Sequence, residues 1–244
     1  MKIEARGVGR GFGKKQALSN VYFECHAGEI VAIVGDNGAG KTTLLQTLAG
    51  LVVPTRGQIQ IDGEILNGRS ESFRRRLAIV PDFPPYFSDR SVLQHLAMLC
   101  RLYGVEAEGL ESRAVGLMEE IGILELGKVP MSSLSRGEVY KTVLVGFLLA
   151  NPELWLLDEP MASGMDPRGL NFLQKHLRAC CAAGASVLYS TQIPEVAEKF
   201  SDRIFVLQKG SLIAQEPAAA LMARTGRATL SDALVALREE NTDS

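Results

Sequence analysis

The chain has 244 residues, which is enough for one large or two small domains with an extensive hydrophobic core. Its composition, 46% apolar and 22% charged, is typical of a globular protein and excludes a disordered chain. The formal net charge of −2 gives no general attraction for nucleic acid or for acidic membrane surfaces, so no nucleic-acid partner is expected.

The first third of the chain alternates short apolar or half-apolar runs with turns that contain glycine or proline. Residues 9–17 are predicted to form a glycine-punctuated loop that carries Phe12. The predicted strands of this region cover residues 2–8, 21–25, 29–34, 59–61 and 77–80.

Residues 35–43, with the sequence GDNGAGKTT, match the phosphate-loop pattern of Gly, four residues and Gly-Lys-Ser/Thr between a predicted strand and a predicted helix over residues 44–49. Glycines let backbone N–H groups approach phosphate oxygens, and the start of the helix adds a positive dipole. Lys41 adds a full charge, and the Thr42 hydroxyl is a suitable ligand for Mg²⁺. The alternative is a plain glycine-rich turn before a helix. The predicted nucleotide-binding residues are Gly35, Asp36, Asn37, Gly38, Ala39, Gly40, Lys41, Thr42 and Thr43.

Residues 82–133 have a different pattern, in which apolar residues recur at helical spacing. We expect a helical subdomain here, inserted between strands. Ser135 and Glu138 have capping-box spacing and are predicted to begin the next helix, which ends near Asn151.

An apolar run over residues 154–157 is predicted to be a buried strand, and it ends in Asp158 and Glu159. Two carboxylates that leave a buried strand downstream of a phosphate loop are typical of triphosphate hydrolysis. Asp158 is placed to hold the Mg²⁺ shell, and Glu159 to orient and polarise the attacking water. The alternative is an acidic strand end that caps the following segment.

Strands and helices continue to alternate toward the end of the chain. Asp166 and Pro167 are the predicted N-cap and first residue of a helix that runs to Ala183. Further strands are predicted over residues 187–189, 203–207 and 211–214, a helix over residues 194–200, and surface helices with a polar tail from residue 216. This alternation predicts an α/β core with a mainly parallel sheet.

These motifs together resemble those of the nucleotide-binding subunits of ABC transporters, across residues 1–215. The elements that carry the resemblance are, in the family's order, the phosphate loop, residues 134–138 as the signature, the Asp158–Glu159 strand end and residues 163–166 as the D-loop. The resemblance implies a P-loop NTPase core with an antiparallel β subdomain and an inserted α-helical subdomain at about residues 82–150. Residues 216–244 are expected to form a C-terminal helical tail.

The resemblance also implies a head-to-tail dimer that encloses two ATP molecules between its subunits. In such a dimer Ser135 and the Gly137 backbone contact the γ-phosphate held by the other subunit, which agrees with a helix N-terminus as an anion site. Phe12 stands where the family places an aromatic residue that stacks on adenine, and the alternative is a phenylalanine in the core. Lys41 and Glu159 take catalytic roles.

Several positions depart from the family pattern. Asp82 stands where Gln is common, and its carboxylate is still an oxygen ligand suited to Mg²⁺, although it adds charge. Gln192 replaces the family's switch histidine as a catalytic residue, and it keeps an N–H donor toward the γ-phosphate but does not titrate near neutral pH. Arg136 and Glu138 stand where Gly and Gln are usual, and the D-loop lies one residue further along the chain than is usual.

These departures leave the rate of hydrolysis open. We expect hydrolysis to be retained, because Lys41, Thr42, Asp158 and Glu159 are all present. Two alternatives remain: a soluble ATP-driven clamp or assembly factor, and a scaffold that senses ATP without turnover. A GTPase is disfavoured, because the chain has no Asn-Lys-x-Asp motif for reading guanine.

The expected function is ATP hydrolysis that powers an ABC transporter, and Asp82 favours an exporter over a nutrient importer. Because no apolar run in the sequence reaches the roughly 20 residues that cross a bilayer, the membrane-spanning subunit is expected to be a separate chain. The resemblance implies that residues 82–103 dock that chain. The four cysteines lack metal-ligand spacing, which favours a reduced compartment and no zinc site. From the resemblance we expect a homodimer bound peripherally at the cytoplasmic face of the membrane.

Overall fold

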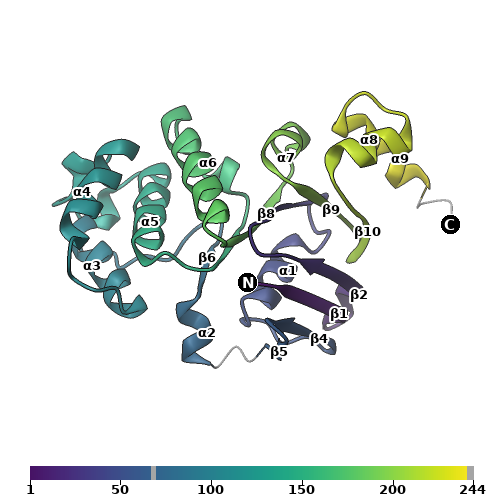
Figure 1. Ribbon diagram of the computed structural model, residues 1–244, viewed down its shortest axis with the longest axis horizontal. Helices are drawn as coiled ribbons and strands as arrows, with labels where there is room; N and C mark the ends of the chain where they lie inside the picture. Colours follow the sequence, from purple (N-terminus) through teal and green to yellow (C-terminus); the bar gives the residue numbers. More distant parts are fainter. Residues whose placement is uncertain (67–69, 241–244) are drawn as a thin grey trace.

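The structure is a computed structural model that describes residues 1–66 and 70–240 (Figure 1). Within this part of the chain the strands are β1 (Ile3–Phe12), β2 (Lys15–Cys25), β3 (Ile30–Val34), β4 (Arg56–Ile61), β5 (Glu64–Ile65), β6 (Leu77–Val80), β7 (Leu154–Leu157), β8 (Ser186–Thr191), β9 (Arg203–Gln208) and β10 (Ser211–Glu216). They form a six-stranded sheet in the order β10-β9-β3-β8-β7-β6 and a four-stranded sheet in the order β2-β1-β4-β5.

The larger sheet is mainly parallel, as the alternation of strands and helices predicts. Strands β9, β3, β8, β7 and β6 are parallel to one another, and only β10 of this sheet runs antiparallel to its neighbour. The smaller sheet is antiparallel throughout its described strands. The predicted α/β fold with an antiparallel β subdomain is therefore confirmed.

The helices connect the strands of the larger sheet or extend beyond it. They are α1 (Lys41–Leu48), α2 (Glu71–Arg75), α3 (Val92–Tyr103), α4 (Leu110–Ile121), α5 (Arg136–Ala150), α6 (Pro167–Ala182), α7 (Pro194–Phe200), α8 (Ala218–Thr225) and α9 (Leu230–Glu240). Figure 1 shows α3, α4 and α5 grouped at one end of the molecule and α8 and α9 at the other. None of the described helices combines the length and the apolar character that a membrane span requires.

Helix starts follow the predicted capping residues. The Ser135 hydroxyl accepts a hydrogen bond from the backbone N–H of Glu138, and the Asp166 carboxylate accepts one from Gly169, so α5 and α6 begin where their caps predict. Helix α1 begins at Lys41, three residues before the predicted start, because the chain enters the helix directly after Gly40.

Strand β7 shows why the central strands are apolar at every position. Trp155 and Leu157 pack into a cluster with residues of α5 and α6, whereas Leu154 and Leu156 pack into a second cluster with residues of α1 and the smaller sheet. A strand that is covered on both faces needs apolar side chains on both, so the alternation of polar and apolar residues is lost. A third cluster lies between α3, α4 and α5.

The prediction of a loop over residues 9–17 is wrong, because this segment forms a β-hairpin. Strand β1 continues to Phe12, which pairs with Lys15 across a tight turn. Gly13 in this turn has a φ of +58°, the left-handed conformation that such hairpin turns favour. Register shifts along β1 break the side-chain alternation, so the glycine-rich strand resembles a loop in sequence.

The segments that carry most of the predicted site residues leave one edge of the larger sheet. The phosphate loop follows β3, Asp82 follows β6, Asp158 follows β7 and Gln192 follows β8. Parallel strands have their carboxyl ends at the same edge, so these loops meet although they are far apart in sequence. This edge therefore positions the site.

Helices α8 and α9 lie at the surface as predicted, but their apolar faces belong to the core. Leu221, Leu230, Leu234 and Leu237 are buried in the cluster that also holds Trp155. Helix α9 also packs against α7. The predicted polar tail includes residues 241–244, which lie outside the described residues.

The substitution Leu234→Ala is expected to lower the free energy of unfolding by about 2–5 kcal/mol, because it removes buried methyl groups and leaves a cavity. Leu234 is 2% exposed, whereas the neighbouring Val235 is 51% exposed. The matched control Val235→Ala is therefore expected to change this free energy by less than about 0.5 kcal/mol. Urea unfolding measures both variants, and equal shifts would show that α9 contributes nothing to the core.

Candidate nucleotide site

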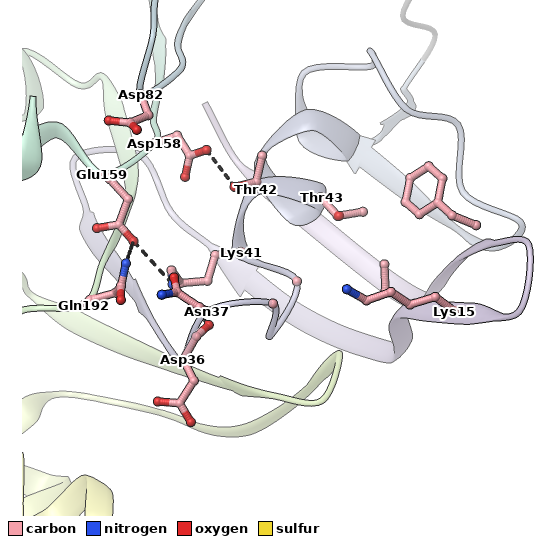
Figure 2. A pocket seen from close by; sticks show the side chains of 14 residues that line it. Lys15, Asp36, Asn37, Lys41, Thr42, Thr43, Asp82, Asp158, Glu159 and Gln192 are labelled. Carbon is pink, nitrogen blue, oxygen red and sulfur yellow. Dashed lines mark hydrogen bonds and ion pairs between the residues drawn. The ribbon is translucent and has the colours of Figure 1, made fainter.

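A cavity of about 440 Å³ opens where the phosphate loop meets the β1–β2 hairpin and the carboxyl edge of the larger sheet (Figure 2). Its lining contains most of the predicted site residues. These are Phe12, Asp36, Asn37, Gly38, Gly40, Lys41, Thr42, Thr43, Asp82, Asp158, Glu159 and Gln192. The lining also includes Lys15 and Ala17, which the sequence did not single out. Ser135 and Gly137 lie outside it, at the start of α5.

The phosphate loop is held so closely by neighbouring backbone that two of its positions require glycine. A Cβ atom on Gly35 would lie 2.4 Å from the carbonyl oxygen of Leu207, and one on Gly40 would lie 2.4 Å from that of Ala17. Gly40 also has a φ of +111°, which other residues rarely adopt. The loop is therefore packed between β9 and β2.

Lys41 presents a buried ammonium group at the base of the cavity. Lys41 is only 6% exposed. Its Nζ donates hydrogen bonds to the carbonyl oxygens of Gly35 at 2.8 Å and Asp36 at 3.3 Å. Nζ also lies 3.3 Å from Oε1 of Glu159. A buried charge needs such partners, because burial removes its hydration.

The Asp158 carboxylate joins the loops that follow three neighbouring strands. It accepts a hydrogen bond from the Thr42 hydroxyl at 2.7 Å and another from the Ser190 hydroxyl at 2.6 Å. The Ser190 hydroxyl in turn accepts a hydrogen bond from the backbone N–H of Glu159 at 2.8 Å. Ser190 therefore links the Asp158 carboxylate to the backbone of Glu159, a role that the sequence analysis missed because strand order is not written in the sequence.

Glu159 and Gln192 contact each other at the cavity wall. Gln192 donates a hydrogen bond from Nε2 to Oε1 of Glu159 at 3.2 Å (Figure 2). Glu159 has a φ of +48°, which is uncommon for a residue with a side chain and is often found at functional sites. Both side chains are thus directed into the cavity by the ends of β7 and β8.

Asp82 lines the cavity, but its carboxylate is paired with Arg136. Arg136 donates a hydrogen bond from Nη2 to Oδ1 of Asp82 and forms an ion pair with it. The Arg136 guanidinium also lies 4.2 Å from the ring centroid of Phe83. The residue predicted as a metal ligand is therefore held by a side chain of the predicted signature.

The β1–β2 hairpin contributes Phe12 and Lys15 to the opposite wall. Phe12 is 46% exposed, so the alternative of a core phenylalanine is wrong. The Arg10 guanidinium lies 4.6 Å from its ring centroid. Phe12 and Lys15 are directly opposite each other in the hairpin and therefore share one face of it. Recognising the hairpin in the sequence would have identified Lys15, which Figure 2 shows extending toward the phosphate loop.

The start of α5 forms the predicted capping box and packs tightly on the following loop. Ser135 donates a hydrogen bond from its hydroxyl to Glu138 at 2.7 Å, which together with the Ser135 backbone N–H lowers the pKa of the Glu138 carboxyl. A Cβ atom on Gly137 would lie 2.4 Å from the carbonyl oxygen of Gly164. The geometry agrees with a cap, and a contact of Ser135 and Gly137 with a second subunit stays a prediction.

The oxygen donors of this site fit Mg²⁺ bound together with phosphates. The Thr42 hydroxyl and the Asp158 carboxylate lie side by side and offer hard oxygen ligands of the kind Mg²⁺ prefers. In the described part of the chain, no group of three or more His, Cys, Asp or Glu residues is arranged to hold a metal ion.

A phosphate loop between a buried strand and a helix, with Thr42 bonded to a carboxylate at the end of a neighbouring parallel strand, defines a phosphate-loop nucleoside triphosphatase. The family model described as ABC transporter matches residues 18–162. The chain therefore belongs to the ABC transporter family, as an ATP-binding subunit with ATPase activity.

Individual relatives are similar over nearly the whole chain. It is 30% identical over 241 residues to the ABC-type transporter ATP-binding protein EcsA of Bacillus subtilis (strain 168), covering 98% of this chain and 97% of EcsA. It is 33% identical to the Nod factor export ATP-binding protein I of Bradyrhizobium diazoefficiens, covering 88% of this chain and 70% of that protein. A solved structure described as the ATP binding subunit of an ABC transporter is 29% identical, with a TM-score of 0.91 over 98% of this chain and 100% of the other.

The substitution Gln192→Ala is expected to lower the rate of ATP hydrolysis about tenfold or more, because it removes the hydrogen bond that Gln192 donates to Glu159 in the cavity. Gln192→His keeps an N–H donor and is expected to retain most of the rate. Phosphate release at saturating ATP measures both variants. An unchanged rate for the alanine variant would contradict a catalytic role for Gln192.

Lys15→Ala is expected to weaken ATP binding about two- to fivefold at low salt, because an exposed cation near the triphosphate contributes a modest and screened attraction. Adenosine binding is expected to stay the same, since adenosine carries no phosphate. Lys14→Ala is the matched control, because Lys14 is adjacent in sequence and is not part of the cavity lining. Titration of each variant with ATP and adenosine tests this, and equal losses for the two lysines would exclude a specific role for Lys15.

Proposed function

We propose that this subunit hydrolyses ATP with Mg²⁺ and powers an exporter through ATP-dependent, head-to-tail dimerisation. The observation that carries the proposal is the chain of contacts from Thr42 through Asp158 and Ser190 to Glu159, with Lys41 beside it. It brings a cation, a metal-ligating pair and a general base to one cavity, which is what triphosphate hydrolysis requires.

Each residue of the cavity has a distinct role in this proposal. Thr42 and Asp158 hold the Mg²⁺ ion, with Asp82 as a further candidate ligand, and the ion neutralises charge on the phosphates when it is bound. Lys41 binds the β- and γ-phosphates together with the phosphate-loop backbone. Phe12 stacks on the adenine.

The ion pair between Lys41 and Glu159 explains how the site prepares for hydrolysis. These groups lie 3.3 Å apart and partly neutralise each other. A bound triphosphate offers Lys41 a stronger anionic partner, so the Glu159 carboxylate is released to accept a proton from the attacking water. Gln192 donates a hydrogen bond to Glu159 beforehand and to the γ-phosphate afterwards.

The dimer is proposed because the residues of the predicted signature lie outside the cavity of their own subunit. Ser135 and Gly137 lie outside this lining, at the start of α5. Placed head to tail, a second copy of the chain brings these residues to the γ-phosphate, and the N-terminal end of its α5 adds a favourable dipole. We propose a homodimer, since one chain supplies both halves of such a site.

Export and membrane attachment are proposed from the relatives and from one surface. Relatives named for Nod factor export support an exporter. A solved relative described as the ATP binding subunit of an ABC transporter supports a separate membrane-spanning chain. This subunit would bind that chain at the cytoplasmic face of the membrane. Exposed apolar side chains of the segment between β6 and α3, and of the first turn of α3, offer a docking surface for that chain. They are Phe83, Tyr86, Phe87 and Leu93.

We also propose a division of the chain along the lines of the family. Residues 1–215 form the nucleotide-binding domain, with the helical subdomain at about residues 82–150 within it. Residues 216–244 form a C-terminal helical extension, whose described helices share the core of the domain.

The substitution Glu159→Gln is expected to lower phosphate release about 10²- to 10⁴-fold, because the amide does not accept a proton from water. ATP binding is expected to persist, so an ATP-bound dimer accumulates that light scattering detects, and excess EDTA is expected to abolish release by the unaltered protein. Equal release rates for the variant and the unaltered protein would contradict the role of Glu159. A variant that binds ATP but stays monomeric would contradict the proposed dimer.

A further inference from the structure

Asp82 and Arg136 carry opposite charges at two positions where the family pattern has uncharged residues, and the two side chains contact each other in the folded protein. Asp82 stands where the family commonly has Gln, and Arg136 stands where it usually has Gly. They lie 54 positions apart in sequence, yet Arg136 Nη2 donates to the Asp82 carboxylate and lies 3.4 Å from its backbone carbonyl oxygen. The guanidinium is also stacked on the adjacent ring of Phe83.

The charge of the cavity explains why Asp82 needs a partner. Asp36 is part of the lining, but its carboxylate points away from the cavity and lies 3.0 Å from the guanidinium of Arg238 (Figure 2). The remaining charged residues of the lining are Lys15, Lys41, Asp82, Asp158 and Glu159. With Asp82 the carboxylates outnumber the ammonium groups, whereas Gln at this position would leave them balanced. An additional anion beside a triphosphate site repels the triphosphate unless a cation neutralises it.

The start of α5 is fixed by contacts with the loop before α6, so the Arg136 guanidinium is presented at a defined place. Gly137, the next residue, packs against the carbonyl oxygen of Gly164. One turn later Lys141 forms an ion pair with Asp166 at 2.9 Å, which lowers the pKa of the Asp166 carboxyl. The backbone that carries Arg136 is therefore attached to the loop before α6, and its guanidinium holds Asp82 at the end of β6.

We propose that Arg136 is a positioning residue that compensates for Asp82, by neutralising and orienting its carboxylate so that the cavity accepts a nucleoside triphosphate. The inference rests on the proposed function, because it concerns the same cavity. It also gives the arginine of the signature segment a role within its own subunit. Through this pair the wall of one nucleotide site is joined to the start of α5, which in the proposed dimer faces the other nucleotide.

A double-mutant cycle tests the compensation. Arg136→Ala is expected to weaken ATP binding about tenfold when Asp82 is present, and less than about twofold in the Asp82→Asn background, because the carboxylate that needed neutralising is then absent. Arg136→Lys keeps the charge and is expected to lose less than Arg136→Ala. Arg75→Ala, which removes an exposed arginine paired with Glu71 on α2, is the matched control and is expected to leave ATP binding unchanged.

The measurements are the dissociation constant for ATP in excess EDTA and in excess Mg²⁺, and the melting temperature without nucleotide. If the alanine variant shows no folded transition, Arg136→Gln takes its place in the cycle. Equal losses in both Asp82 backgrounds would overturn the proposal, because Arg136 would then act on the nucleotide or on another subunit. No loss in either background would also overturn it. Absence of ATP binding by the unaltered protein would instead contradict the proposed function.

Discussion

The parallel pairing of β3, β8, β7 and β6 is the constraint on which the site depends. Parallel neighbours end at the same edge, so the loops that follow them meet there, whereas antiparallel pairing would send alternate loops to opposite edges. The Asp158 carboxylate uses this arrangement, because Oδ2 accepts a hydrogen bond from Thr42 after β3 and Oδ1 accepts one from Ser190 at the end of β8. One buried carboxylate thereby holds three loops in a common geometry.

The same edge holds the less favourable features of the fold. Lys41 is a buried cation, Glu159 has a left-handed backbone, and the phosphate loop is pressed against neighbouring backbone at Gly35 and Gly40. Such features persist only where the surrounding structure determines them. Here the apolar strands covered on both faces supply that structure, since their packing leaves the loops little freedom to relax. The packing of the hydrophobic core thus stabilises the unfavourable backbone and charge arrangements of the site.

Helix α5 connects this cavity to the surface proposed to meet a second subunit. Arg136 reaches the end of β6, Gly137 packs on Gly164, and Lys141 pairs with Asp166 at the start of α6. These contacts lie on the first two turns of α5. A displacement of the start of α5 would therefore also displace the segments that these three residues contact. In the proposed dimer, the wall of one nucleotide cavity and the surface that meets the second subunit would therefore both be attached to α5.

The sequence by itself determined the parts of the site that depend on neighbouring residues. The spacing of Gly35 and Lys41, the buried strand before Asp158 and the capping box at Ser135 are local patterns, and each forms where it was predicted. Only the tertiary structure decided the hairpin that brings Lys15 beside Phe12, the Ser190 hydroxyl that links the Asp158 carboxylate to the Glu159 backbone, and the pairing of Asp82 with Arg136. Each depends on strand order, register or contacts between distant segments, and these arise from packing of the whole chain, which local spacing does not encode.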